Sequence, residues 1–156
     1  MPVQNPKILQ SQVVGVSFGE NVSYVEPVNL YGCKIGSNTF IGPFVEIQMK
    51  VSIGENCKIQ SHSFICELVE IGNNCFIGHG VMFINDLFEG GKPAGGNKQL
   101  WKSTKVGSNV SIGSNATILP VQICDGAVIG AGSVVTKDIV EKGIYVGNPA
   151  RKIRSL

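Results

Sequence analysis

Apolar residues recur every six positions along nearly the whole chain, and this period restricts the possible fold more than any other feature. The apolar anchors are Phe18, Tyr24, Leu30, Ile35, Ile41, Ile47, Ile53, Ile59, Ile65, Ile71, Ile77, Phe83, Val106, Ile112, Ile118, Ile123, Ile129 and Val135. An α-helix needs apolar residues at three- and four-residue steps, and a simple strand needs strict alternation, so neither explains this period. It fits a coil of short straight sides that meet at tight corners.

Most of the six-residue units also share two smaller features. The second position is glycine at 36, 42, 54, 72, 78, 107, 113 and 130. The fifth position is small or β-branched, as at Thr39, Val45, Val51, Cys57, Ser63 and Val110. We expect the glycines to supply a corner backbone geometry that a Cβ would obstruct. The pattern resembles the hexapeptide repeat, which implies an all-β, left-handed parallel β-helix.

Three units make one triangular coil of 18 residues, so the anchors predict about six three-sided coils. Two sides are one residue short, Leu30 to Lys34 and Ile118 to Gln122, and both are the third side of their coil. This coincidence supports the three-sided phase. At about 4.8 Å between stacked strands, six coils would stand about 29 Å tall. We expect a single domain, 1–156, with one long extruded loop at 86–105 and a short C-terminal tail at 138–156.

The composition excludes several other classes of protein. A length of 156 residues with 43% hydrophobic residues suits one domain, and a net charge of +2 with scattered positive residues predicts no nucleic-acid or membrane partner. The segment MPVQNPKILQ lacks the features of a signal peptide, and no apolar run approaches the roughly 18 residues that span a bilayer. We therefore expect a cytoplasmic protein. None of the five cysteines forms a C-x-x-C pair, so we expect reduced packing thiols and no metal.

The repeat stops within the stretch IGHGVMFINDLFEGG, residues 77–91, and restarts at Val106. About 17 residues intervene, which makes a loop extruded from one edge of the prism, and long loops of this kind are often functional. Leu100 and Trp101 near its end need a neighbour to pack on.

Residues 18 apart stack on one another, and this arithmetic groups the polar candidates into two columns. The first column contains Pro43, Ser61, His79, Ser114 and Ala131. The second places Asn85 above Met49 and Glu67, with Asp86 next to it at the mouth of the loop. Small residues on the carboxyl-terminal side of His79 leave a shallow track, so an acceptor would lie towards the earlier coils.

Several strings narrow the resemblance to one family. These are IGPFVEIQ, IQSHSFIC, IGHGVMFINDLF, PAGGNKQLW, VSIGSNATILPV and IGAGSVVTKDI with the later GNPA. Together, over roughly residues 15 to 153, they resemble the N-acetyltransferases that act on dTDP-3-amino-3,6-dideoxyhexoses. The resemblance implies acetyl-coenzyme A as acyl donor, a nucleotide-sugar substrate, a homotrimer with sites between subunits, and a role in lipopolysaccharide O-antigen or S-layer glycan biosynthesis.

The two columns and this resemblance together assign the candidate residues. We expect Asn85 and Asp86 to hold the acceptor amine, and His79 to assist by orientation or proton transfer; Asp86 has an alternative role as a turn residue that caps backbone amides. Glu67 and His62 are candidates for sugar contacts. The candidates for coenzyme binding are Ser114 and Ala131 along the track, and Asn148, Arg151 and Lys152 near the phosphates.

The chemistry of an amine acceptor makes a strong base unnecessary. An amine with a pKa of about 8 is roughly a tenth neutral at pH 7, so freeing its lone pair costs only about 1.4 kcal/mol. A hydroxyl acceptor would instead need a positioned histidine, so an O-acetyltransferase with His79 as general base is the nearest alternative. A γ-carbonic anhydrase needs three histidine ligands, and only His62 and His79 are present. A non-enzymatic β-helix scaffold is the third alternative; no threonine ladder suggests ice binding.

Overall fold

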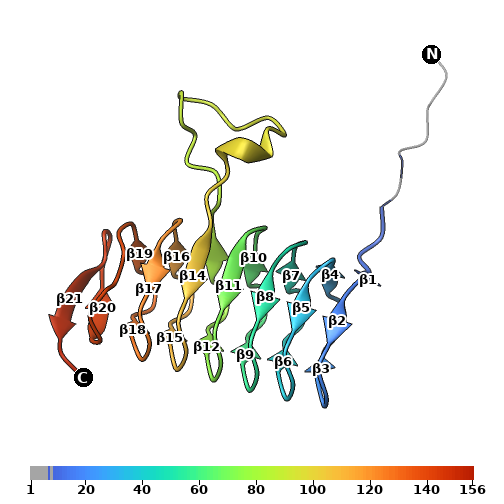
Figure 1. Cartoon of the computed structure of the whole chain (residues 1–156), viewed down its shortest axis with the longest axis horizontal. Coiled ribbons are helices and arrows are strands. Elements are labelled where there is room, and N and C mark those ends of the chain that lie inside the picture. Colours follow the sequence, from blue (N-terminus) through green and yellow to red (C-terminus); the bar gives the residue numbers. More distant parts are fainter. Residues whose placement is uncertain (1–6, 8) are drawn as a thin grey trace.

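The chain folds into a left-handed parallel β-helix of about seven turns, in which short strands stack into three sheets. The computed structural model describes residue 7 and residues 9–156. Figure 1 shows the coils side by side, with the first strands at one end of the stack and the last at the other. The prediction that MPVQNPKILQ is no signal peptide falls largely on residues outside the described ones.

Each sheet forms one side of the prism. Sheet A consists of β1 (Val13–Val14), β4 (Asn29–Tyr31), β7 (Glu46–Ile47), β10 (Phe64–Ile65), β13 (Met82–Phe83), β16 (Thr117–Ile118) and β19 (Val134–Val135). Sheet B consists of β2 (Ser17–Phe18), β5 (Lys34–Ile35), β8 (Ser52–Ile53), β11 (Val69–Ile71), β14 (Thr104–Val106) and β17 (Gln122–Ile123). Sheet C consists of β3 (Ser23–Tyr24), β6 (Phe40–Ile41), β9 (Lys58–Ile59), β12 (Phe76–Ile77), β15 (Ser111–Ile112), β18 (Val128–Ile129), β20 (Ile144–Val146) and β21 (Arg151–Arg154).

The register of the strands confirms the predicted phase. Lys34 pairs with Ser52, 18 residues on, whereas Asn29 pairs with Glu46 and Thr117 with Val134, each 17 residues on. The shorter spacing occurs where a turn passes one of the two short sides. The structure has about one turn more than the anchors predicted, because β1 precedes the first anchor and β20 continues sheet C beyond the last one.

The anchors and the fifth-position residues fill the interior, as predicted. Anchors of the middle coils, such as Ile41, Ile59 and Ile77, have no exposed surface, and Thr39 and Ser63 are 1% exposed. Phe18 and Tyr24 differ, with exposed fractions of 40% and 39%. They pair in register with buried anchors of the next coil but lie at the open end of the prism, where their rings stack at 6.1 Å between centroids.

The corner geometry is shared between two residue types rather than supplied by the repeat glycines alone. A Cβ on Gly36 would lie 2.5 Å from the carbonyl carbon of Gly54 in the next coil, so this glycine permits close stacking of the coils. The left-handed backbone conformation falls two residues later, on Asn38 with φ 57°. Asparagine tolerates this conformation better than most residues do.

All five cysteines are free thiols, and four of them are buried. Cys57 and Cys75 stack in the interior, as predicted, with the Cys75 N–H donating to Cys57 Sγ at 3.5 Å. The hydrogen bond with Cys57 and burial together raise the pKa of the Cys75 thiol. Burial raises the pKa of Cys33 to about 11, so this thiol stays protonated at neutral pH.

Two segments depart from the plain coil. The loop leaves sheet A after β13 and returns at β14, and it contains a short 3₁₀ helix, η1 (Lys98–Leu100); Figure 1 shows it rising from one edge of the stack. The C-terminal tail is more regular than predicted, since β20 adds to sheet C and β21 turns back antiparallel to β20. No helix in the described part of the chain is long and apolar enough to cross a membrane.

The stacked anchors carry most of the stability of the prism. Ile59→Ala removes a fully buried side chain between two coils, and we expect a loss of about 2–5 kcal/mol in the free energy of unfolding. The neighbouring Lys58 points outward, so Lys58→Ala is expected to change the free energy by about 0.5 kcal/mol or less. Urea denaturation of both variants measures this, and equal effects would contradict the described core.

Candidate functional site

Asn85 lies at the corner between sheets A and B, where the coil gives way to the loop; this corner is called the A–B corner below. Its Nδ2 donates to the Glu67 carbonyl at 3.2 Å, and its own carbonyl accepts from the Lys102 N–H at 2.9 Å. The predicted stacking of Asn85 on Glu67 is therefore confirmed. No hydrogen bond among the described residues occupies Asn85 Oδ1, which leaves this oxygen able to accept from a ligand.

The carboxylate of Asp86 organises the start of the loop. Its Oδ1 accepts from the Phe88 N–H at 2.9 Å, and its Oδ2 accepts from the Ala94 N–H at 2.8 Å. This is the capping role that the sequence offered as an alternative to direct chemistry. Because each carboxylate oxygen has a second lone pair, the same group can also accept a hydrogen bond from a ligand.

Glu67 lies beneath the loop instead of facing open solvent. Its side chain is 7% exposed, and its carboxylate contacts Lys98 Nζ at 2.5 Å and Lys50 Nζ at 3.9 Å. The Lys98 ammonium also lies 5.2 Å from the ring centroid of Trp101. These contacts hold the loop against the coil, and they leave the predicted role of Glu67 in binding sugar to the lysines above it.

An apolar hollow of about 360 Å³ lies between the loop and sheet A; we call it the loop hollow. It is lined by Gln48, Phe64, Cys66, Phe83, Ile84, Asn85, Asp86, Phe88 and Trp101. Trp101 thus has the packing partner that the sequence predicted for it. Burial raises the pKa of Cys66 to about 12, so its thiol is a neutral part of the wall.

A row of hydrogen bonds runs down from Asn85 along sheet A. The Glu67 N–H donates to Gln48 Oε1 at 3.2 Å, while Gln48 Nε2 and Tyr31 Oη each donate to Glu46 Oε1 at 3.2 Å. Burial and the nearby charge of Glu46 raise the pKa of Tyr31, so its phenol remains a donor. The sequence analysis did not single out Tyr31, Glu46 or Gln48, although column arithmetic already places them on one outer face.

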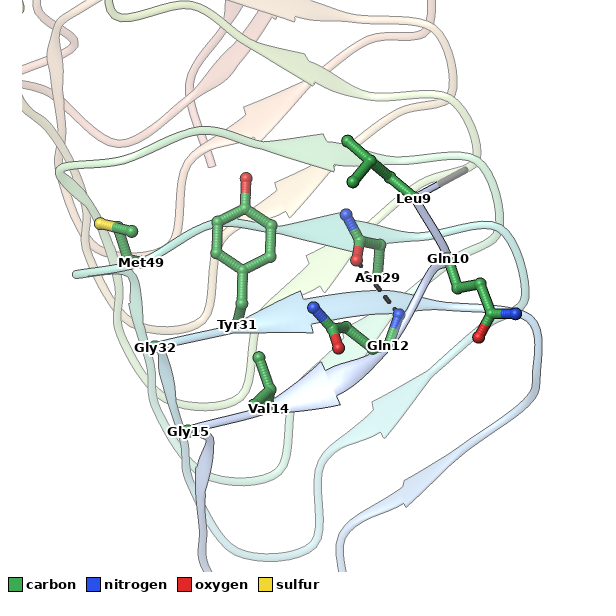
Figure 2. Close-up of a pocket in the computed structure, with 9 residues that line it drawn as sticks. All are labelled: Leu9, Gln10, Gln12, Val14, Gly15, Asn29, Tyr31, Gly32 and Met49. Carbon is green, nitrogen blue, oxygen red and sulfur yellow. Dashed lines mark hydrogen bonds between the residues drawn. The ribbon is translucent and has the colours of Figure 1, made fainter. Parts of the chain in front are cut away.

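A second and larger hollow, of about 840 Å³, lies at the first coils on the same face; we call it the first-coil hollow. Figure 2 shows its lining, with Tyr31 standing on β4 between Asn29 and Met49, and with the Gln12 N–H donating to Asn29 Oδ1 at 3.3 Å. Its remaining lining residues are Leu9, Gln10, Val14, Gly15 and Gly32. Apolar walls with amide groups at the edge suit a flat heterocyclic ligand.

His79 lies at the opposite edge of sheet A, on the corner between sheets C and A; we call it the C–A corner. Its Nδ1 is 2.8 Å from Ser61 Oγ, which confirms the predicted stacking of these residues and orients the ring. His62 belongs to the same corner and stacks on Phe44, with 4.8 Å between ring centroids. Six residues separate His79 from Asn85, a span of about 20 Å in extended chain. One subunit therefore does not bring the two together.

The predicted coenzyme residues continue the C–A corner and the tail. The carbonyl of Ser114 accepts from the Gly132 N–H at 2.8 Å, and the neighbouring Ala131 is exposed, so the column is present and open. Asn148 is exposed, as is Arg151, which forms no ion pair within the described residues. Lys152 instead pairs with Glu141 at 2.5 Å, so its charge is partly compensated.

The described residues contain no group of three or more histidine, cysteine, aspartate or glutamate side chains that could hold a metal ion. What the site offers is a set of hydrogen-bonding groups beside two hollows on one face. The arrangement suits the binding and orientation of an organic substrate.

Comparison with known families finds two matching segments. Residues 32–67 match the bacterial transferase hexapeptide (six repeats), and residues 103–137 match the hexapeptide repeat of succinyl-transferase. Among curated proteins, the bifunctional protein GlmU of Clostridium botulinum is 34% identical over 146 residues, covering 92% of this chain and 28% of GlmU. GlmU of Acetivibrio thermocellus is 31% identical over 153 residues, covering 97% of this chain and 30% of GlmU. The chain thus spans under a third of these relatives.

Solved structures with the same fold cover far more of their own chains. A variant of AntD, an N-acyltransferase from Bacillus cereus in complex with dTDP and coenzyme A, has a TM-score of 0.78 at 28% identity, covering 89% of this chain and 83% of AntD. A hexapeptide transferase family protein from Anaplasma phagocytophilum has a TM-score of 0.72 at 20% identity, covering 90% and 79%. The second likeness concerns the fold alone.

The repeat, the prism and these matches define the class: the chain is a hexapeptide-repeat acyltransferase. Within that class it resembles the dTDP-amino-sugar N-acetyltransferases, as its sequence strings predicted.

Proposed function

We propose that this protein transfers an acetyl group from acetyl-coenzyme A to the 3-amino group of a dTDP-linked 3-amino-3,6-dideoxyhexose. The observation that carries the proposal is the A–B corner, where the unoccupied Asn85 Oδ1 and the Asp86 carboxylate lie at the loop hollow. The likeness to AntD, which was solved with both dTDP and coenzyme A, supports the two substrate classes.

The acceptor extends along sheet A from the first coils to the loop. The nucleoside occupies the first-coil hollow, where Tyr31 and Met49 offer apolar surface and Asn29 an amide group (Figure 2). The hexose occupies the loop hollow, whose apolar walls suit a deoxygenated sugar carbon better than a hydroxymethyl group. Its 3-amino group then faces Asn85 and Asp86.

The reaction needs positioning more than it needs a strong base. Asn85 Oδ1 accepts an N–H of the neutral amine and directs the nitrogen lone pair at the thioester carbonyl, while Asp86 fixes the loop around it. The C–N bond forms, the C–S bond breaks, and the thiolate that leaves can take up the proton that the nitrogen loses. His79, oriented by Ser61, assists by orientation or proton transfer.

The proposed site requires two copies of the chain. Acetyl-coenzyme A lies along the C–A corner on Ser114 and Ala131, with its phosphates near Asn148, Arg151 and Lys152. The acceptor lies at the A–B corner, about 20 Å away across the same sheet. A cyclic trimer in which the C–A corner of one copy faces the A–B corner of the next joins the two halves. The proposed assembly is therefore a homotrimer with three sites between subunits.

The test is thiol release from acetyl-coenzyme A with a panel of acceptors. We expect release with dTDP-3-amino-3,6-dideoxygalactose or its gluco epimer, and much less with a UDP-3-amino sugar, serine or a simple galactoside. Release with the hydroxyl acceptors alone would contradict the proposal and make His79 the general base. No release with any acceptor would favour a scaffold role.

A further inference from the structure

We propose that Lys98 and Lys50 form a diphosphate-binding site between the two hollows of sheet A. The inference rests on the proposed function and names the part of the acceptor that these lysines recognise. None of the residues predicted from the sequence provides a positive charge at this end of the site, whereas a nucleotide sugar carries its negative charges midway along its length.

The position of the Lys98 ammonium is the first observation. Its Nζ lies 3.8 Å from Met49 Sδ, and Met49 lines the first-coil hollow. The same Nζ lies 5.2 Å from the ring centroid of Trp101, which lines the loop hollow. The ammonium therefore sits at the boundary between the two hollows. Along sheet A the order is first-coil hollow, lysines and loop hollow, which matches the order nucleoside, diphosphate and hexose.

The distribution of charge is the second observation. The Glu67 carboxylate is 7% exposed and contacts both lysines, whereas the side chains of Lys98 and Lys50 are 48% and 62% exposed. Glu67 thus positions the two ammonium groups from below, and their remaining N–H donors face outward. One buried negative charge beneath two positive charges leaves a net positive pair, which suits charge-assisted hydrogen bonds to phosphate oxygens.

The nearest further carboxylate is directed elsewhere. Glu46 lies on β7 in the preceding coil, and its Oε1 accepts from Tyr31 Oη and Gln48 Nε2. It therefore belongs to the nucleoside end of the face. A diphosphate that approaches from the loop side meets Lys98 and Lys50 first, and Lys98 then connects ligand binding to closure of the loop because it belongs to η1.

Calorimetric titration with dTDP and with thymidine tests this site. We expect Lys98→Met and Lys50→Met each to weaken dTDP binding about tenfold, with a shallower dependence of affinity on salt, because a charge-assisted contact is lost. Thymidine carries no phosphate, so its binding should not change. Lys98→Arg should retain most of the affinity for dTDP. Lys102→Met is the matched control, since Lys102 belongs to the same loop but pairs with Glu89 at 3.6 Å.

Three outcomes would overturn the inference in distinguishable ways. Unchanged dTDP affinity in both lysine variants would refute the diphosphate site alone and leave the proposed acyl transfer intact. Equal weakening of dTDP and thymidine, with the salt dependence of the wild type, would show that the lysines only support the loop. If the wild-type protein binds no dTDP, the proposed acceptor fails together with this site.

Discussion

An Asn85→Ala, Asp86→Ala double variant is expected to lose about a hundredfold or more of the wild-type kcat/KM for the amino-sugar acceptor. Alanine at 85 removes the oxygen that receives the amine, and it also removes the donor to the Glu67 carbonyl. Alanine at 86 releases the Phe88 and Ala94 N–H groups, so the start of the loop loses its fixed shape. Misplacing the reacting nitrogen by about 1 Å is enough for a loss of this size.

Steady-state kinetics with the dTDP-linked amino sugar measure this effect, and two controls accompany it. Glu89→Gln changes an exposed ion pair of the same loop with Lys102 and should retain wild-type activity. Binding of acetyl-coenzyme A to the double variant should remain normal, because the coenzyme occupies the other corner of the prism. Wild-type turnover by the double variant would remove the A–B corner from the proposed mechanism.

The fold was almost completely predictable because one period governs every coil. A six-residue repeat determines which side chain points inward, so the stacking of Ile41, Ile59 and Ile77 follows from their spacing alone. The same arithmetic brought Ser61 and His79 together, and the structure joins them at 2.8 Å. Prediction was weaker at the ends of the prism, where Phe18 keeps its register but has no further coil to cover it.

The site was predictable only as far as the repeat extends into it. Asn85 could be stacked on Glu67 because both belong to coil positions. Lys98 could not be placed, because it belongs to a loop whose path depends on contacts with Glu67, Met49 and Trp101 rather than on any period. Asp86 stands at the junction, and its position was predictable while its two backbone partners were not.

The separation of His79 from Asn85 has the clearest consequence for assembly. Both are candidates for one reaction, yet they occupy opposite edges of sheet A, so each chain holds half of two different sites. This predicts that two inactive variants can restore activity in each other. The first is the Asn85→Ala, Asp86→Ala double variant, which damages the A–B corner. The second is Ala131→Trp, which fills the coenzyme track at the C–A corner with an exposed, bulky side chain.

Equal amounts of the two variants, unfolded together and refolded, should recover about a quarter of wild-type activity. A site works only if its C–A corner comes from one variant and its A–B corner from the other, and random mixing gives this combination in about one site in four. Each variant refolded by itself should stay inactive, which controls for recovery during refolding. Because a site contained in a single chain would be defective in every subunit, a mixture without activity would contradict the shared site, whereas recovery near a quarter requires neighbouring copies to contribute opposite edges of sheet A.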